Sequence, residues 1–498
     1  MSIAENSNRS QNRLLVLGLS GIAATSALIY GLIFTIPANF QTVVVRSKVY
    51  QDYLFSTPPA TRWWMIAAFC TLAILYGLGW YIARRLRGLA AWAVVIIGSL
   101  VFGILLSYIY PIDASDLFNN ILIGRIQSIY HANPFVQVAD NFKGDKFFPL
   151  VSFSYLPTTY GPVWEILAGV AARLGDNGMF ASVLALKWLP GIFMLASTGV
   201  IAAILKKQAS NTILAGVLMF AWNPIVLYEV WGNGHNDIVM VFFILLAVWA
   251  LLYKRYTIAI LALAAGTLVK FIPILLIPAA GLIAIRELPS LRARFRFIVA
   301  TLISVSLLAF LIYLPFWQGF QVLTVFQRSN LFTTSLPAVI YRLSTPGLGQ
   351  KRAAELISSA ALILTIGFAV WQGWRAYRNT SIYSFAQASF NILAFYLLIT
   401  CLWFQQWYTV WLIGLAPILA SGAAQLFAIL FGFLAIGKQL FMYPLVIWPN
   451  PRPPQPRLEI ELTLGVLGLP WMLALALLFR KYTPFRFPVR KSSPTSYK

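Results

Sequence analysis

The stretch 89-LAAWAVVIIGSLVFGILLSYI-109, followed directly by 110-YPIDASDLFNN-120, decides the fold class of this chain. Its first part carries no charged residue, and about 20 consecutive apolar residues are enough for an α-helix to cross the ~30 Å hydrocarbon core of a bilayer. The second part places two carboxylates, Asp113 and Asp116, at the end of the apolar run. The stretch therefore predicts a membrane-spanning helix that delivers acidic side chains to one membrane surface.

The composition of the whole chain agrees with this prediction. Of its 498 residues, 60% are hydrophobic and 10% are charged, against about 45–50% and about 25% in soluble domains. The mean hydropathy is +0.77. The alternation of apolar and polar residues that is typical of barrel strands is absent, so the backbone is expected to satisfy its hydrogen bonds in helices. We predict an all-α polytopic membrane helix bundle that forms a single domain over residues 1–498.

Apolar segments recur along the chain and predict its topology. There are about 14 of them, at residues 14–36, 63–83, 89–109, 179–205, 211–229, 236–253, 257–270, 271–285, 297–316, 354–374, 384–401, 408–422, 424–446 and 460–480. The positive-inside rule requires the Lys and Arg clusters between these segments to share the cytoplasmic side. They do so only if residues 257–285 form two short helices with a break near 268-LVKFIP-273. Both termini are then expected in the cytoplasm, with residues 14–36 as an uncleaved anchor.

The charge of the chain has a membrane explanation. Its 37 Lys and Arg against 14 Asp and Glu give a net charge of +23. Because the basic residues cluster between apolar segments, we expect them to set orientation and to meet anionic lipid headgroups rather than nucleic acid. Cys70 and Cys401 lie far apart in apolar surroundings, which predicts neither a disulfide nor a metal site.

The acidic residues gather in the loops that are predicted to face outward. Eight of the 14 lie between positions 113 and 237. Residues 110–163 form a connection much longer than the roughly 12–15 residues usual for a loop within a compact domain, and such loops are often functional. Its aromatic residues and prolines argue against disorder. We predict a structured outer loop with short interfacial helices.

Asp113 and Asp116 are three residues apart and share a face if a helix begins at this point. An Asp at a helix start is also an ordinary N-cap, which is the alternative interpretation for Asp113. The following residues contain Arg125, His131 and an Asn-Pro turn at 133–134.

Further motifs follow in order along the chain. They are 158-TTYGPVWE-165, 221-AWNPIVLYEVWGNGHND-237, 268-LVKFIPILLIP-278 and 405-QQWYTVWLIGLAP-417. Together with residues 115–135, this series resembles the GT-C glycosyltransferases that depend on polyprenyl-phosphate mannose, the bacterial α-mannosyltransferases among them.

The resemblance implies a GT-C catalytic core over residues 89–420. Residues 14–83 would be an added N-terminal helix pair, and residues 424–498 C-terminal helices with a basic cytoplasmic tail. The implied activity is transfer of a hexose, foremost mannose, from a polyprenyl-phosphate donor to a lipid-linked or cell-envelope glycan. The active site would face outward from a bacterial plasma membrane.

The chemistry of such a transfer assigns roles to two residues. A carboxylate must accept the proton of the acceptor hydroxyl, and cations must stabilise the departing phosphate. Asp116 is the candidate general base. Lys270 lies in an apolar stretch where a charge costs roughly 2.5–3.5 kcal/mol to insert, so it either binds the donor phosphate or snorkels to the membrane surface.

The remaining candidates for substrate binding come from the motifs, and they are Arg125, His131, Tyr160, Glu229, His235, Asn236, Asp237, Gln406, Trp407 and Tyr408. Asp237 could instead cap the helix that follows it. Gln406 to Tyr408 could belong to an ordinary interfacial aromatic belt. His235, Asp237 and Asp116 could bind a divalent cation, although no ligand spacing compels a metal.

Two other classes of protein fit part of the pattern. A transporter or lipid flippase would spread ionisable residues through the bilayer depth and contain inverted repeats, whereas here the acids cluster at one face and no repeat is evident. A polymerase or ligase that uses lipid-linked oligosaccharides would share the predicted site.

Overall fold

The computed structural model describes residues 3–46, 53, 57–112, 115–208, 210–327, 331–379, 381–440, 442, 454 and 456–480. Over these residues the regular structure is helical, with two isolated β-bridges and no strand. The prediction of an all-α fold is confirmed. Asp113, one of the two predicted catalytic residues, lies outside the described residues.

The α-helices follow one another along the chain, and a long connection separates α6 from α7. They are α1 (Ile3–Ile29), α2 (Phe40–Arg46), α4 (Pro59–Ala83), α5 (Leu89–Ser107), α6 (Asp116–Ser128), α7 (Pro162–Leu174), α8 (Met179–Lys207), α9 (Ile213–Ala221), α10 (Pro224–Leu227), α11 (Asp237–Leu252), α12 (Tyr256–Thr267), α13 (Ile277–Glu287), α14 (Leu291–Tyr313), α15 (Leu336–Leu348), α16 (Gln350–Arg378), α17 (Ser384–Phe395), α18 (Val410–Leu415), α19 (Gly422–Ala435) and α20 (Arg457–Arg480).

Eight helical stretches in the described residues are long and apolar enough to cross a membrane. They are Ser10–Thr35, Ala60–Ala83, Leu89–Ser107, Met179–Lys207, Leu291–Phe316, Gln350–Arg378, Gly422–Leu440 and Arg457–Leu477. A bent pair, α9 with α10 and the π-helix η4 (Tyr228–Gly232), would be a ninth. The chain is therefore built as a multi-pass membrane protein, whereas the total of about 14 segments stays a prediction because the other apolar helices are short.

The short helices arise from identifiable breaks. Residues 211–229, predicted as one segment, bend by 44° between α9 and α10. The Asn223 side chain accepts bonds from Ile225 N and Val226 N and so starts a new helix, while Pro224 has no N–H to continue the old one.

Two further breaks lie beside the motifs. Residues 408–422, also predicted as one segment, divide into the 3-10 turn η9 (Gln406–Thr409), α18 and a second 3-10 turn, η10 (Ala416–Ile418). The break predicted near 268-LVKFIP-273 is confirmed, because α12 ends at Thr267 and the 3-10 turn η5 (Ile272–Leu276) precedes α13.

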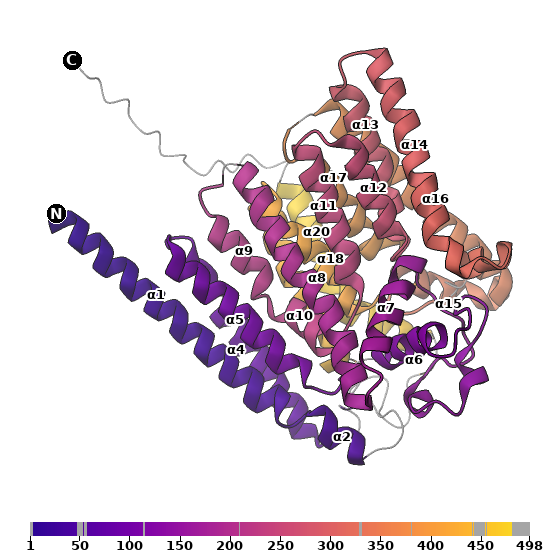
Figure 1. The fold of residues 1–498 in the computed structure, drawn as a ribbon, viewed down its shortest axis with the longest axis horizontal. Helices are drawn as coiled ribbons and strands as arrows, with labels where there is room; N and C mark the ends of the chain where they lie inside the picture. Colours follow the sequence, from indigo (N-terminus) through magenta and orange to yellow (C-terminus); the bar gives the residue numbers. More distant parts are fainter. Residues whose placement is uncertain are drawn as a thin grey trace.

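The helices pack as a bundle with two flanks (Figure 1). The helices α1, α4 and α5 lie side by side at one edge, and α13, α14 and α16 form the opposite edge. Between them α11 packs against α8, α12 and α18. Within residues 110–163, α6 contacts two 3-10 turns, η2 (Ala139–Phe142) and η3 (Phe148–Leu150), and α6 also packs against α7. This connection is therefore structured over its described residues, and its location outside the membrane stays a prediction.

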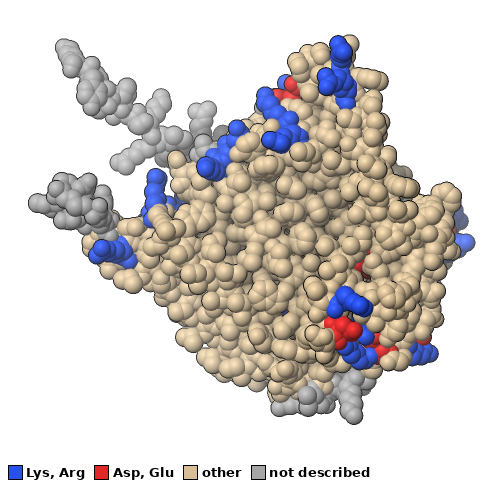
Figure 2. All heavy atoms as spheres, viewed as in Figure 1, with Lys and Arg blue, Asp and Glu red and all other residues tan. Residues whose placement is uncertain are grey.

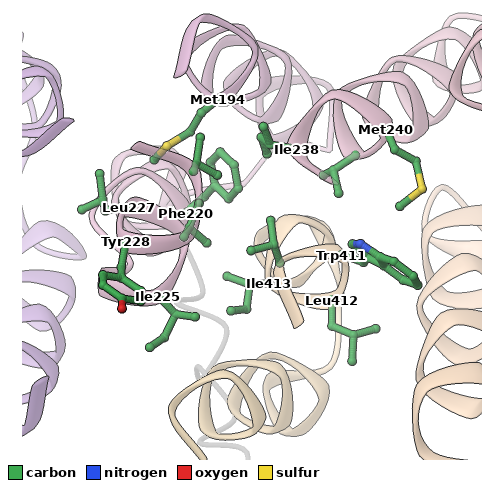
Figure 3. Close-up of a cluster of buried hydrophobic side chains, with 14 of the residues drawn as sticks. Met194, Phe220, Ile225, Leu227, Tyr228, Ile238, Met240, Trp411, Leu412 and Ile413 are labelled. Carbon is green, nitrogen blue, oxygen red and sulfur yellow. The ribbon is translucent and has the colours of Figure 1, made fainter. Parts of the chain in front are cut away.

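The surface and the core reflect the membrane environment. Figure 2 shows charged side chains gathered toward two ends of the visible face, with a broad uncharged region between them. Figure 3 shows part of the buried core, where Trp411, Leu412 and Ile413 of α18 lie opposite Ile238 and Met240 of α11. This packing fixes the first turn of α11, which begins at Asp237.

Candidate active site

The Tyr-Gly-Pro motif docks on the helix break between α12 and η5. Gly161 N donates to Val269 O at 3.0 Å, and Val163 N donates to Leu268 O at 3.0 Å. A Cβ atom at Gly161 would overlap the Leu268 carbonyl, so only glycine permits this approach. The contact brings Tyr160 beside Lys270, whose Nζ lies 5.7 Å from the Tyr160 ring centroid.

Lys270 forms an ion pair in an aromatic enclosure. Its Nζ lies 2.8 Å from Asp237 Oδ1, and the Lys270 side chain is 15% exposed. The ring centroids of Tyr408 and Trp411 lie 4.4 Å and 5.4 Å from the same ammonium. One of its three N–H donors is used by Asp237, which leaves two without a hydrogen-bond partner among the described residues.

Asp237 is the first residue of α11 and is 1% exposed. Its Oδ1 also accepts a bond from Trp411 Nε1 at 2.5 Å. Its Oδ2 is buried and has no hydrogen-bond partner among the described residues. The carboxylate is thus held by Lys270 and Trp411, and one oxygen is left for a ligand.

Asp116 is the first residue of α6 and is half-buried. The Tyr160 side chain lies near this carboxylate. Burial raises the pKa of Asp116 above its ordinary value, and the nearby Asp237 raises it further, while His235, Lys270 and Tyr160 oppose the shift. A carboxylate with a raised pKa is a stronger base than one in water, which suits proton abstraction.

His235 lies between a carboxylate and an aromatic ring. Its Nδ1 is 3.0 Å from Glu229 Oε2, and its ring stacks on Trp407 with centroids 4.0 Å apart. Glu229 is fully buried and also accepts a bond from Asn233 Nδ2 at 3.1 Å. These contacts hold the Gly-His-Asn-Asp turn in place, and His235 lies near enough to Asp116 to oppose the rise in its pKa.

The turn is tied to the other segments of the site. Asn233 Oδ1 accepts a bond from Ile112 N at 3.0 Å, which anchors the residues just before the Asp113–Asp116 stretch. Gly234 has φ +75°, a conformation that favours glycine. Asn236 is buried, and its Nδ2 has no hydrogen-bond partner among the described residues.

The Gln-Gln-Trp-Tyr segment forms another wall. Gln405 Oε1 accepts a bond from the buried Lys438 at 2.9 Å, as does the Phe404 carbonyl. Gln406 is buried beside it. Trp407 and Tyr408 reach His235 and Lys270 respectively, so this segment contributes to the same site and not to the surface alone.

Two predicted substrate-binding residues have other surroundings. Arg125 pairs with Asp145 at 2.7 Å and with Asp176, and this network ties α6 to the residues that follow it and to the residues after α7. The hydrogen bond from Arg125 lowers the pKa of Asp176. His131 is exposed, with φ +52°.

No group of three or more His, Cys, Asp or Glu among the described residues is arranged to hold a metal ion. His235, Asp237 and Asp116 thus do not form such a group by themselves.

Comparison with known sequences supplies the family. The sequence model for the MptA_B family, described as alpha-(1->6)-mannopyranosyltransferase, N-terminal domain, matches residues 18–286. The chain belongs to this family. It is therefore a GT-C-type membrane mannosyltransferase, in agreement with the predicted resemblance. No curated protein matches the chain.

Two buried charged residues of this mannosyltransferase escaped the sequence interpretation. Lys187 of α8 is fully buried and donates to the Ile109 carbonyl, just before the acidic stretch. Glu165 of α7 is fully buried and accepts a bond from Thr158, and burial raises its pKa to about 8. The sequence did contain a signal for Lys187, which is a lone Lys within the apolar run 179–205. Inserting a charged residue into a membrane costs free energy, so such residues are usually functional.

The close contact between Gly161 and Leu268 can be tested for its role in positioning Tyr160. Gly161→Ala should destabilise the protein by about 1–3 kcal/mol, as overpacking does, and should lower transfer because Tyr160 moves away from Asp116 and Lys270. Gly144→Ala, in the same loop with no atom within 4 Å of its Cβ position, is the matched control. Thermal unfolding in detergent and transfer rates measure both effects. Equal behaviour of the two variants would contradict the docking role of Gly161.

Proposed function

We propose that this membrane mannosyltransferase takes mannose from a polyprenyl-phosphate donor and transfers it to a hydroxyl of a lipid-linked or cell-envelope glycan. The observation that carries the proposal is the meeting of Asp116, Asp237, Lys270 and His235 among the aromatic rings of Tyr160, Trp407 and Tyr408. A base, a cation and stacking surfaces are what such a transfer requires.

In the proposed reaction Asp116 accepts the proton of the acceptor hydroxyl. The hydroxyl oxygen attacks C1 of mannose, and the bond between C1 and the phosphate oxygen breaks. The electron pair of that bond leaves with polyprenyl phosphate, whose charge the two unused N–H donors of Lys270 stabilise. A single displacement of this kind inverts the anomeric centre and needs one carboxylate base.

The proposed orientation places the site on the extracytoplasmic side, with both termini in the cytoplasm. The basic clusters support it through the positive-inside rule, and the short helices would complete the count of about 14 segments. In a variant with Cys70 and Cys401 replaced by Ser, a cysteine at Lys146 should react with an impermeant thiol reagent applied outside. A cysteine at Arg85 should not; labelling with the opposite preference would reverse the orientation.

The donor is tested directly on membranes that contain the protein. They are incubated with a panel of radiolabelled polyprenyl-phosphate sugars and, in parallel, with a labelled sugar nucleotide. We expect label to move from polyprenyl-phosphate mannose to a glycan acceptor, and Asp116→Asn membranes provide the blank. If label moves from the sugar nucleotide and from none of the polyprenyl-phosphate sugars, the proposed donor is wrong, because the enzyme then uses a donor without a lipid phosphate.

A further inference from the structure

We infer that a cavity lined by Phe153, Arg342 and Trp403 binds a pyranose ring of the acceptor glycan. This inference rests on the proposed function and names a part of its acceptor site. The cavity has a volume of about 340 Å³, which is within the range of roughly 300–1,000 Å³ typical of small-molecule sites. Its walls come from three segments that lie far apart in the sequence.

The walls are built by specific contacts. Thr333 N donates to Leu402 O and Phe404 N donates to Thr333 O, which forms a parallel bridge between Thr333 and Trp403. Phe332 stacks on Tyr341 with centroids 4.4 Å apart and an interplanar angle of 9°. The cavity is therefore a preformed part of the fold.

Both sides of the cavity connect to the site. Trp403 lines the cavity and lies four positions before Trp407, the ring that stacks on His235. On the other side Phe153 lines the cavity, and its neighbour Ser152 donates its N–H to Asn119 Oδ1 at 3.2 Å. Asn119 lies in the first turn of α6, which begins at Asp116. A glycan seated in the cavity can thus extend toward the proposed base.

The chemistry of the cavity matches a sugar ring. The aromatic side chains of Phe153 and Trp403 line the cavity beside the stacked pair of Phe332 and Tyr341. Aromatic side chains suit the C–H surface of a pyranose as they suit other apolar surfaces. Arg342 supplies hydrogen-bond donors. Its Nε lies 4.0 Å from the buried Glu459, while its terminal nitrogens have no hydrogen-bond partner among the described residues. A free phosphate would have to lose its water against these rings, whereas a sugar presents both an apolar face and hydroxyls.

The test measures the binding of an α-linked mannose disaccharide, without donor, to the purified full chain by ligand-observed NMR, and also steady-state transfer. Phe153→Ala and Arg342→Gln should each raise the dissociation constant and the acceptor KM by about tenfold, which corresponds to about 1.4 kcal/mol. The donor KM and the kcat at saturating acceptor should stay unchanged. Phe153 is 37% exposed, so its variant is expected to fold.

Arg352→Gln, an exposed position on α16, is the matched control and should bind the disaccharide as the wild type does. The inference is overturned if the two cavity variants bind the disaccharide normally, if the wild type does not bind it, or if the donor KM rises in place of the acceptor KM. Disaccharide binding that depends on the cavity, together with no transfer from any donor, would uphold the cavity and refute the proposed function.

Discussion

Replacement of Asp116 by Asn should lower the rate of mannosyl transfer by about 10²–10⁴-fold, as loss of a general base does, while donor binding is largely kept. The amide cannot accept the proton of the acceptor hydroxyl, but it keeps the size of the carboxylate and its contact with Tyr160. Because burial raises the pKa of Asp116, the acidic limb of the wild-type pH–rate profile should have its midpoint above the ordinary Asp value of about 3.9. Below that midpoint the base is protonated and the rate falls.

Two comparisons make this result specific. Asp140→Asn changes a carboxylate of the same loop outside the site and should leave transfer unchanged, and Asp113→Asn should reduce transfer less than Asp116→Asn. Near-normal transfer by the Asp116 variant together with an inactive Asp113 variant would assign the base to Asp113. Activity in both variants would refute the proposed mechanism.

Lys270→Met should raise the donor Kd about tenfold or more and lower kcat, because hydrogen bonds to charged groups contribute about 1.5–3 kcal/mol. The same change leaves the buried Asp237 carboxylate without its cation, which costs about 3–5 kcal/mol in comparable pairs. The variant is therefore expected to be less stable as well as less active. Donor titrations and thermal unfolding in detergent measure the two effects.

The double variant Lys270→Met/Asp237→Asn separates these effects. It removes both charges, so it should recover stability while donor binding stays weak. Lys146→Met, which removes a partly exposed cation that pairs with Asp176 at 3.5 Å, should leave donor binding unchanged. If the donor Kd and kcat of Lys270→Met are unchanged, Lys270 does not bind the donor phosphate, and its ammonium group only extends to the membrane surface.

Local signals in the sequence predicted the principal pieces of the site. A Lys and a Pro within the apolar stretch 268–278 marked the helix break, and the carboxylates after residue 109 marked the start of α6. These features depend on near neighbours in the chain. The structure brings Asp116, Tyr160, Asp237 and Lys270 together, which the order of the motifs suggested but spacing alone could not establish.

Other features depend on contacts between distant residues. Arg125 pairs with carboxylates 20 and 51 positions away, and no periodicity joins them. The bend at Asn223 forms because its side chain caps a new helix. The apolar residues on both sides of Asn223 would also fit one continuous helix, so the sequence alone did not predict the bend. The cavity around Arg342 is absent from the sequence pattern, because its walls are assembled by backbone bonds between residues 333 and 402–404.

The bond from Trp411 to Asp237 joins residues 174 positions apart, and it has a consequence for the synthesis of the protein. The region matched by the family, residues 18–286, contains Asp116, Asp237 and Lys270 but not Trp407, Tyr408 or Trp411. When the ribosome has completed that region, Asp237 and Lys270 still lack their aromatic enclosure. The site is therefore assembled in two stages, because Trp407, Tyr408 and Trp411 can join Asp237 and Lys270 only after residues 407–411 have been synthesised.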